Sequence, residues 1–456
     1  MQEYVVQLSK YFIVICMALY TYEGFAVFRF KTEHGRNGIY TRQCILLFFV
    51  QFASFLTICL KSGDLQYLFF YGITQLLLFG IIAMTKMLYP GCNRLLVNNM
   101  CMLLGIGLIV LSRISFDKAM RQFILILFSV IIALFVPYLL EKMKFLHKLT
   151  WVYALIGVTA LSVVLLLGQV THGSRISFTV AGITFQPSEF VKILFVFFLA
   201  ASLKEDTSIK NLILTTFVSA VHVIVLVVSK DLGSALIFFV AFVFVVFMAT
   251  GNYFYLLLGF AGGAGASVLA YHLFRHVQVR VQAFLDPWTY IDKQGYQVTQ
   301  SLFAIGSGGW FGLGLYSGTP EAVPYVDKDS IFSAICEEMG VVTGLFVILI
   351  CISCFLMIMN IAVRIRDRFY KLTAYGLGVI YIFQIFLTIG GGIKFIPLTG
   401  VTLPLVSYGG SSILTTLIMF YIIQGFYILR RQEEETRALQ EGKRHPRKEA
   451  EERQEQ

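Results

Sequence analysis

Ionisable side chains are scarce in this chain, and the densest set of them lies in residues 275–328, where charged and aromatic residues are interleaved. Such a mixture is typical of a sugar-binding surface, in which aromatic faces stack on pyranose rings and charged groups hold the polar substituents. The alternative for any single aromatic residue is a belt that anchors the segment at the level of lipid headgroups. The charged members are Arg275, His276, Arg280, Asp286, Asp292, Lys293, Glu321, Asp327 and Lys328, and the aromatic ones are Phe284, Trp288, Tyr290, Tyr296 and Trp310.

A second set of charges falls inside or beside long apolar runs. Glu189 and Lys192 are three residues apart, so on a helix they share a face and can pair. An unpaired charge inside a membrane costs on the order of several kcal/mol, so pairing or a polar cavity is required. Asp231, Glu337 and Glu338 allow the same two interpretations, because they either line a cavity or brace the helices around it.

The elements that position these side chains are predicted to cross a membrane. Of the 456 residues, 57% are hydrophobic and 14% charged, and the mean hydropathy is +0.77. A water-soluble domain of this composition would lack polar surface. About thirteen runs match the template of about 20 mostly apolar residues that a spanning helix needs. They are 11–30, 43–60, 64–88, 96–113, 121–140, 149–168, 187–203, 211–229, 231–250, 253–274, 331–364, 372–393 and 409–430.

The net charge of +10 is distributed in a way that indicates membrane topology and no nucleic-acid partner. Basic residues concentrate in alternate breaks between the apolar runs, which we place in the cytoplasm. The N-terminus is then outside, the charged tail is inside, and the loops at 169–186 and 275–328 are extracellular. Arg113, Lys118 and Arg121 fall in an outside break and oppose this rule. The basic breaks contain Lys31, Arg36 and Arg42; Lys86 and Arg94; Lys142, Lys144 and Lys148; and Arg364, Arg366, Arg368 and Lys371.

Seven sequence motifs occur in a fixed order at predicted membrane boundaries. Together they resemble the SEDS family (shape, elongation, division and sporulation; FtsW, RodA and SpoVE), membrane glycosyltransferases that polymerise lipid II into peptidoglycan. Any one of the motifs alone would be weak, but the set spreads over most of the chain. They are GSRISF (173–178), FQPSEFVKI (185–193), KDLGSA (230–235), FLDPW (284–288), GYQVTQSLFAIGSGG (295–309), KDSIFSAICEEMG (328–340) and PLTGVTLPLVSYGGSS (397–412).

The resemblance implies an all-α fold, a polytopic transmembrane helix bundle with a ten-helix core. Its first core helix would be 96–113, so residues 1–94 would add about three N-terminal helices whose role the resemblance does not specify. The core would span 95–430, with the large loop 275–328 outside. Residues 431–456 would form a charged cytoplasmic tail, either disordered or a frayed helix, because this segment has almost no apolar residues.

The resemblance also implies a catalytic role for Asp329, which matches the essential aspartate of the family. Its carboxylate would accept the proton of a sugar 4-hydroxyl while that oxygen attacks an anomeric carbon and a lipid pyrophosphate leaves. Partial desolvation beside Phe332 would raise its pKa. The alternative is that Asp329 caps the helix beginning at Ser330, and Asp327 is a second, lower-ranked carboxylate.

Positive groups are needed for the departing pyrophosphate. The candidates are Arg280, Lys192, Arg175 and Lys394, although Lys394 could equally anchor its helix at the interface. A divalent cation, Mg²⁺ or Mn²⁺, is a further means of neutralising the phosphates. Glu189, Asp231, Glu338 and Ser407 complete the predicted substrate-binding set. The SYGGSS run, which contains Ser407, has an alternative role to substrate binding, which is to permit close packing of the helices.

The predicted function is therefore a peptidoglycan polymerase in the cytoplasmic membrane of a bacterium, acting in division, elongation or sporulation. Its partners would be lipid II, undecaprenyl-pyrophosphate-linked glycan, membrane lipids and a class B penicillin-binding protein. A lipid II flippase is one alternative, but a transporter should show internal repeats, and residues 1–220 and 221–430 show no such symmetry. A non-catalytic scaffold of a cell-wall synthesis complex is the other.

Overall fold

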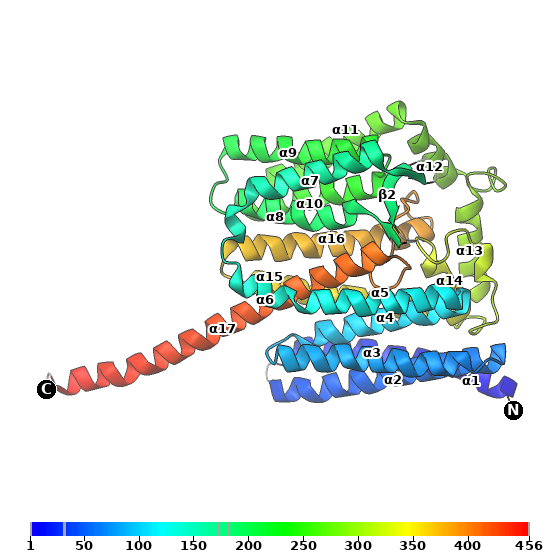
Figure 1. The fold of residues 1–456 in the computed structure, drawn as a ribbon, viewed down its shortest axis with the longest axis horizontal. Helices are drawn as coiled ribbons and strands as arrows, with labels where there is room; N and C mark the ends of the chain where they lie inside the picture. The colour runs from blue at the N-terminus through cyan, green and yellow to red at the C-terminus, as the bar shows by residue number, and fades with distance from the viewer. Residues whose placement is uncertain (1, 31–32, 172–173, 181–182, 455–456) are drawn as a thin grey trace.

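The computed structural model describes residues 2–30, 33–171, 174–180 and 183–454. It is a bundle of roughly parallel helices with α12, α13 and α14 gathered at one end, called here the site end (Figure 1). The long last helix projects beyond the opposite end, called the tail end, and the two chain termini lie at opposite ends. In this part of the chain, twelve helices are long and apolar enough to cross a membrane.

The first three helices lie side by side along one edge of the bundle, and the remaining helices form the core (Figure 1). The N-terminal elements are α1 (Gln2–Ala26), η1 (Val27–Arg29), α2 (Glu33–Ser62) and α3 (Gln66–Leu88). The first half of the core contains α4 (Arg94–Ile114), α5 (Phe116–Leu134), α6 (Val136–Lys142), η2 (Leu146–Lys148), α7 (Thr150–Leu167), α8 (Pro187–Leu203), α9 (Ile209–Val228), α10 (Leu232–Thr250) and α11 (Tyr253–Leu273). The second half contains α12 (Arg275–Leu285), α13 (Tyr296–Gly308), η3 (Pro320–Ala322), α14 (Ile331–Met339), α15 (Val341–Arg364), α16 (Arg368–Gly392) and α17 (Gly410–Gln454).

Local sequence accounts for where several of these helices begin. Asn93, Ser115, Ser208 and Asp367 each accept a hydrogen bond from a backbone N–H in the first turn of the following helix. These side chains satisfy donors that no helical carbonyl can reach. At the other end of α10, Gly251 takes the left-handed conformation that ends a helix (φ 68°).

The predicted spans and loops correspond to observed elements, with four differences in detail. The run 187–203 is α8, whose 17 residues are at the short limit of a crossing. The loop 169–186 folds into a small antiparallel sheet of order β1-β2-β3, formed by Gln169–Thr171, Ser174–Val180 and Ile183–Phe185. The loop 275–328 contains α12, α13 and η3, and is therefore largely ordered.

The fourth difference is that the run 331–364 is not a single helix. It breaks at Gly340 into the short α14 and the long α15. Gly340 has a φ of 89°, and a Cβ there would lie 2.5 Å from backbone atoms of Trp310, Phe311 and Gly312. Only glycine satisfies both conditions without strain, so the loop after α13 docks directly against the break.

The extra helices α1–α3 are packed onto the core through α4, whose membrane-crossing segment is completely buried. α1 also packs on α15, and two hydrogen bonds through Asn99 of α4 link these two helices. The Tyr20 hydroxyl donates to the Asn99 Oδ1 at 3.2 Å, and the Asn99 amide donates to the Ser353 hydroxyl at 3.1 Å. Hydrogen bonds between helices in an apolar medium favour one arrangement of those helices, so α1 is held in a defined position.

α4 in turn approaches the connection between α16 and α17 very closely. A Cβ at Gly107 would lie 2.5 Å from the carbonyl oxygen of Val406. The absence of a side chain at this position allows the connection, which carries Ser407, to rest against α4.

We expect Gly107→Ala to lower the thermal unfolding midpoint in detergent, because the methyl group forces backbone apart and overpacking costs about 1–3 kcal/mol. Gly80→Ala is the matched control, since Gly80 lies in α3 with nothing within 4 Å of the new Cβ. That control should be neutral or slightly stabilising, given the helix propensity of alanine. Equal effects of the two substitutions would contradict the close approach.

Candidate functional site

Asp329 is buried at the site end, one residue before the helix cap of α14, with 7% of its surface exposed. Gln297 in the first turn of α13 donates from its amide to both carboxylate oxygens at 3.2 Å and to the Ser330 hydroxyl at 3.0 Å. Burial raises the pKa of Asp329 to about 6, against the opposing effects of Gln297 and of the Arg280 and Lys328 charges. Ser330 is the N-cap residue of α14 and makes no side-chain cap bond.

Arg280 from α12 lies beside this carboxylate. Its Nη1 donates to the carbonyl of Thr399 at 3.1 Å, and both its Nη2 and the Asp329 Oδ2 lie 4.0 Å from the position a Cβ would take on Gly400. Burial lowers the pKa of Arg280, while the Asp231 and Asp329 carboxylates act in the opposite direction. Arg280 is thus a largely desolvated cation placed between two carboxylates.

Two more basic groups surround Arg280. The pKa of His276 is lowered by burial and by the Arg280 and Lys230 charges. The Nε2 atom of His276 is buried and has no hydrogen-bond partner among the described residues. Arg280 and Lys230 therefore create a positive region near Asp329, and His276, whose pKa lies below its ordinary value, adds an imidazole that is uncharged at neutral pH.

A pocket of about 280 Å³ lies between α5 and the start of α17. It is bounded by the basic side chains of Arg121, on α5, and Lys328, in the loop before α14, and by the apolar Ile124 and Leu125. Its remaining lining is polar or small: Gln186, Thr402, Tyr408, Gly409, Gly410, Ser411 and Ser412. Lys328 is adjacent to Asp329 in sequence, so the pocket reaches the immediate neighbourhood of the carboxylate.

Ser407 fixes the backbone that carries Asp329. Its hydroxyl donates to the carbonyl of Lys328 at 2.5 Å and accepts from the Leu403 N–H at 2.8 Å. The Tyr408 N–H donates to the Asp327 carbonyl at 2.7 Å. Asp327 itself is paired with Lys118 of α5 at 3.0 Å. Ser407 and Asp327 therefore position the segment, and Asp329 supplies the carboxylate that is held by the neutral amide of Gln297.

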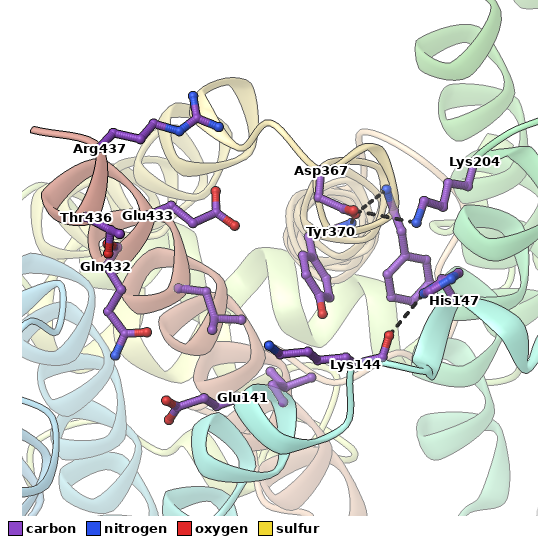
Figure 2. A pocket seen from close by; sticks show the side chains of 13 residues that line it. Glu141, Lys144, His147, Lys204, Asp367, Tyr370, Gln432, Glu433, Thr436 and Arg437 are labelled. Atoms are coloured by element: carbon purple, nitrogen blue, oxygen red, sulfur yellow. Dashed lines mark hydrogen bonds and ion pairs between the residues drawn. The ribbon is translucent and has the colours of Figure 1, made fainter. Parts of the chain in front are cut away.

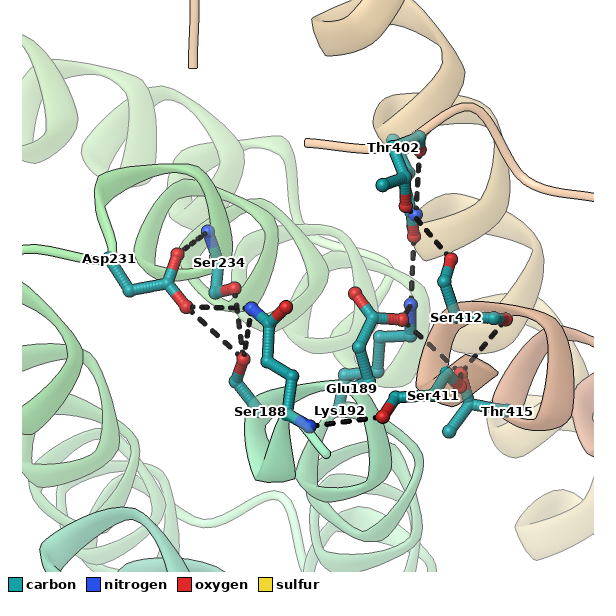
Figure 3. A network of polar contacts seen from close by, with 11 residues as sticks. Ser188, Glu189, Lys192, Asp231, Ser234, Thr402, Ser411, Ser412 and Thr415 are labelled. Atoms are coloured by element: carbon teal, nitrogen blue, oxygen red, sulfur yellow. Dashed lines mark hydrogen bonds and ion pairs between the residues drawn. The ribbon is translucent and has the colours of Figure 1, made fainter. Parts of the chain in front are cut away.

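Figure 3 shows how Asp231, at the start of α10, is connected to α8. Its Oδ1 accepts from the Ser234 N–H at 3.1 Å, and its Oδ2 accepts from the Ser188 hydroxyl at 3.1 Å and from the Gln186 amide at 3.4 Å. Burial raises the pKa of Asp231, and the bonds from Ser234 and Ser188 oppose this. Asp231 thus braces α8 against α10 and adds negative charge near Arg280.

Glu189 and Lys192 pair at 2.7 Å, as their spacing predicted. Both are buried, and the pair extends into a network (Figure 3). Lys192 also donates to Gln384 of α16 at 2.8 Å, and the Gln384 amide donates to the Thr402 carbonyl at 3.0 Å. Thr415 of α17 donates to Glu189 at 3.2 Å. The pair therefore ties α8, α16, α17 and the 393–409 connection together, and neither charge lacks a partner.

Glu338 forms an ion pair with a cation from α4, the first core helix. Arg113 of α4 donates to Glu338 at 2.8 Å, to Glu321 at 2.6 Å and to the Gly318 carbonyl at 3.0 Å, and its guanidinium lies over the Tyr316 ring at 4.4 Å. Glu337 accepts from the Thr319 N–H at 2.8 Å. Of the two interpretations of these glutamates, the geometry favours bracing of the 309–330 loop.

Two of the predicted cations, Lys394 and Arg175, make no contact with Asp329 that the structure describes. Lys394 has a left-handed φ of 57°, and its amine makes no hydrogen bond or ion pair within the described ranges. Arg175 lies in β2, but its side chain is outside what the structure describes. Conversely, sequence reasoning did not select Gln297 or Gln384, because their contacts join residues far apart in the chain, and it named Arg121 and Lys328 without giving either a substrate-binding role.

A bundle of membrane-crossing helices with a desolvated carboxylate at one end defines an integral-membrane protein with its reactive site near one bilayer boundary. The model of the FtsW, RodA and SpoVE family, described as cell cycle proteins, matches residues 93–432. This chain belongs to that family. The matched region takes in the core helices from α4 onwards, and α1–α3 lie outside it.

Curated relatives include the peptidoglycan glycosyltransferase RodA of Mycobacterium tuberculosis, 32% identical over 383 residues, which covers 77% of this chain and 82% of the relative. The probable peptidoglycan glycosyltransferase FtsW of Nitrosococcus halophilus is 32% identical over 294 residues, covering 62% of this chain and 76% of that one.

Solved structures agree with the fold. A chain from a structure described as "Structural coordination of polymerization and crosslinking by a peptidoglycan synthase complex" matches with a TM-score of 0.65, 23% identity, and coverage of 75% of this chain and 99% of that chain. The rod shape determining protein RodA of Thermus thermophilus matches with a TM-score of 0.55 and 21% identity, covering 74% and 96%.

We expect Arg113→Met to lower the free energy of unfolding by about 3–5 kcal/mol, because it leaves the buried Glu338 without a cation; Glu338→Gln should cost less, because Arg113 keeps its ion pair with Glu321. The double variant should lose much less than the sum of the two. Thermal unfolding of the purified protein measures all three.

Arg42→Met is the matched control, since its ion pair with Glu23 at 2.6 Å is formed by a side chain that is 57% exposed. This substitution should lower the free energy of unfolding by about 1 kcal/mol or less. Additive effects at Arg113 and Glu338 would show that the two side chains act independently.

Proposed function

We propose that this chain is a peptidoglycan glycosyltransferase that joins lipid II units into glycan strands. The observation that carries the proposal is Asp329, a buried carboxylate with a raised pKa, which lies near the cations Arg280 and Lys328 and next to the pocket lined by Lys328 and Arg121. The family membership and the names of the curated relatives support the same activity.

Asp329 would act as the general base. Its pKa of about 6 leaves it ionised near neutral pH yet makes it a stronger proton acceptor than an ordinary aspartate. It would take the proton of an acceptor 4-hydroxyl as that oxygen forms a bond to the anomeric carbon of the donor. The bond from this carbon to the lipid pyrophosphate would break, so the anomeric configuration inverts and the electron pair leaves with the pyrophosphate.

The two cationic regions correspond to the two lipid-linked reactants. Each reactant carries a pyrophosphate, and positive groups in a partly desolvated site stabilise such anions more strongly than in water. Arg280 and Lys230 would hold one pyrophosphate, with the neutral His276 imidazole beside them, while Arg121 and Lys328 would hold the other. The apolar wall at Ile124 and Leu125 would admit the start of a polyprenyl chain from the bilayer.

The described side chains do not provide the ligands of a metal ion that the protein would bind by itself. No group of three His, Cys, Asp or Glu side chains suited to a metal ion occurs among the described residues. A divalent cation, Mg²⁺ or Mn²⁺, would instead arrive on the substrate phosphates and take at most one carboxylate from the chain. No step above depends on it.

For orientation, the basic residues of the alternate inter-helix breaks support a cytoplasmic tail end, and Asp329 would then lie on the outer face of the cytoplasmic membrane. The N-terminus would then be outside. As partner we propose a class B penicillin-binding protein, because the similar fold in the peptidoglycan synthase complex is described as coordinating polymerisation with crosslinking.

We expect Asp329→Asn to reduce lipid II polymerisation by a factor of at least about 100, because the amide cannot accept the proton. Asp327→Asn is the control: its carboxylate is already paired with Lys118, so polymerisation should fall only a few-fold. Gel-resolved glycan from purified protein with its transpeptidase partner measures both. Full activity of a folded Asp329→Asn protein would instead direct attention to lipid II translocation or a scaffolding role.

A second prediction concerns pH. Because the ionised form is active, the polymerisation rate should rise as pH increases through about 6 and level off above about 7. Gln297→Met removes the amide that holds the pKa of Asp329 down, so the midpoint of this rise should move to higher pH. Gln300→Met, on the same helix, is a control that should leave the midpoint in place. An unchanged midpoint in Gln297→Met would contradict the assignment of the titrating group.

A further inference from the structure

A cavity of about 640 Å³ lies at the tail end, remote from Asp329 along the bundle (Figures 1 and 2). The first part of the charged tail, on α17, forms one wall, and the connection from α6 to η2 and the start of α16 form the others. The lining residues are Leu140, Glu141, Lys144, His147, Lys204, Asp367, Phe369, Tyr370, Leu429, Gln432, Glu433, Thr436 and Arg437.

The charges in this cavity are balanced, but they do not all neutralise one another. Lys204 pairs with Asp367 at 3.6 Å. The Lys144 amine, the Tyr370 hydroxyl and the Glu433 carboxylate form no hydrogen bond or ion pair within the part of the chain that the structure describes. Figure 2 shows these three groups directed into the open space. The cavity therefore offers two hydrogen-bond donors and one anionic acceptor around the same volume.

An apolar groove of about 210 Å³ adjoins the cavity. Leu140 lines both spaces, and the short segment after α6 separates them. In this segment Met143 and Leu146 face the groove, while Lys144 and His147 face the cavity. The rest of the groove consists of Val136, Leu139, Tyr153, Ile193, Leu194, Phe197 and Ile422.

The junction of the two spaces lies at a membrane boundary. One candidate span ends at Lys142, and another begins at Arg368. The cavity is therefore at the level of the lipid headgroups, and the groove extends from it along the membrane-crossing helices α7, α8 and α17. The charged cavity at headgroup level and the apolar groove that adjoins it match a phospholipid, which has a charged headgroup and apolar acyl chains.

We propose that this site binds a zwitterionic phospholipid whose headgroup carries a primary ammonium, an ethanolamine phospholipid. Lys144 and the Tyr370 hydroxyl would bind the phosphate, Glu433 would bind the ammonium, and an acyl chain would occupy the groove. The three carboxylates Glu141, Asp367 and Glu433 offset the three cations Lys144, Lys204 and Arg437, so the cavity lacks the net positive charge that would favour an anionic lipid.

The test uses the full-length protein, stripped of lipid in detergent and incubated with mixed micelles that contain equal amounts of phosphatidylethanolamine, phosphatidylcholine and phosphatidylglycerol. Native mass spectrometry then counts the lipids retained by each protein molecule. We expect phosphatidylethanolamine to exceed each competitor by about fivefold or more, because charge-assisted hydrogen bonds fix both ends of its headgroup. Equal retention of the three lipids, or a preference for phosphatidylglycerol, would overturn the proposal.

Matched variants locate the site. Lys144→Glu and Glu433→Lys should each remove most of the preference, whereas Lys142→Glu and Glu434→Lys should keep it. Lys142 lies over the Tyr138 ring outside the cavity, and Glu434 is engaged with Arg430. Should a charge reversal prevent folding, Tyr370→Phe and Glu433→Gln probe the same contacts, and a preference unchanged in these folded variants would overturn the proposal.

The groove has its own test. Leu139 lines the groove with 48% of its surface exposed, so Leu139→Trp should fill the groove and reduce total retention of phosphatidylethanolamine by about fivefold, through loss of apolar contact. Ile132→Trp is the control on the preceding helix, at a lipid-exposed position outside the groove. Equal retention by the two variants would exclude the groove as the acyl-chain site.

Discussion

The site depends on how the 393–409 connection satisfies its backbone within the bundle. Non-helical backbone surrounded by membrane-crossing helices is tolerated only where the protein itself supplies hydrogen-bond partners. Each partner here comes from a different part of the fold. Arg280 of α12 binds the Thr399 carbonyl, Thr388 and Gln384 of α16 bind those of Val401 and Thr402, and Gln122 of α5 binds that of Ser407.

These bonds explain why structural and candidate catalytic residues are hard to separate in this protein. Lys192 donates a hydrogen bond to Gln384, and the Gln384 amide donates one to the Thr402 carbonyl. The Ser407 hydroxyl donates to the carbonyl of Lys328, the residue next to Asp329. The polar groups that satisfy the backbone of the irregular 393–409 connection are therefore the same ones that position the Asp329 carboxylate. A change in this network alters both the stability of the bundle and the geometry of the site.

The sequence predicted the membrane-crossing architecture well, because apolar runs of sufficient length have few other structural solutions. It also predicted the pair Glu189–Lys192, which is local. The break at Gly340 was missed because Ile331–Met339 continues the apolar run, although the adjacent Glu337 and Glu338 were a signal against a lipid-facing helix. The bond from Gln297 to Asp329 and the pocket at Arg121 and Lys328 depend on tertiary contacts that one sequence does not encode locally.

Arg113, Lys118 and Arg121 opposed the loop-charge rule, and the structure gives the reason. Arg113 is neutralised by Glu338, 225 positions later, and Lys118 by Asp327, 209 positions later. During synthesis the α4–α5 hairpin is made long before either acid exists. Its cations must therefore remain hydrated or be screened by other groups until α13 and α14 emerge, so final closure of this end of the bundle is a late event in biogenesis.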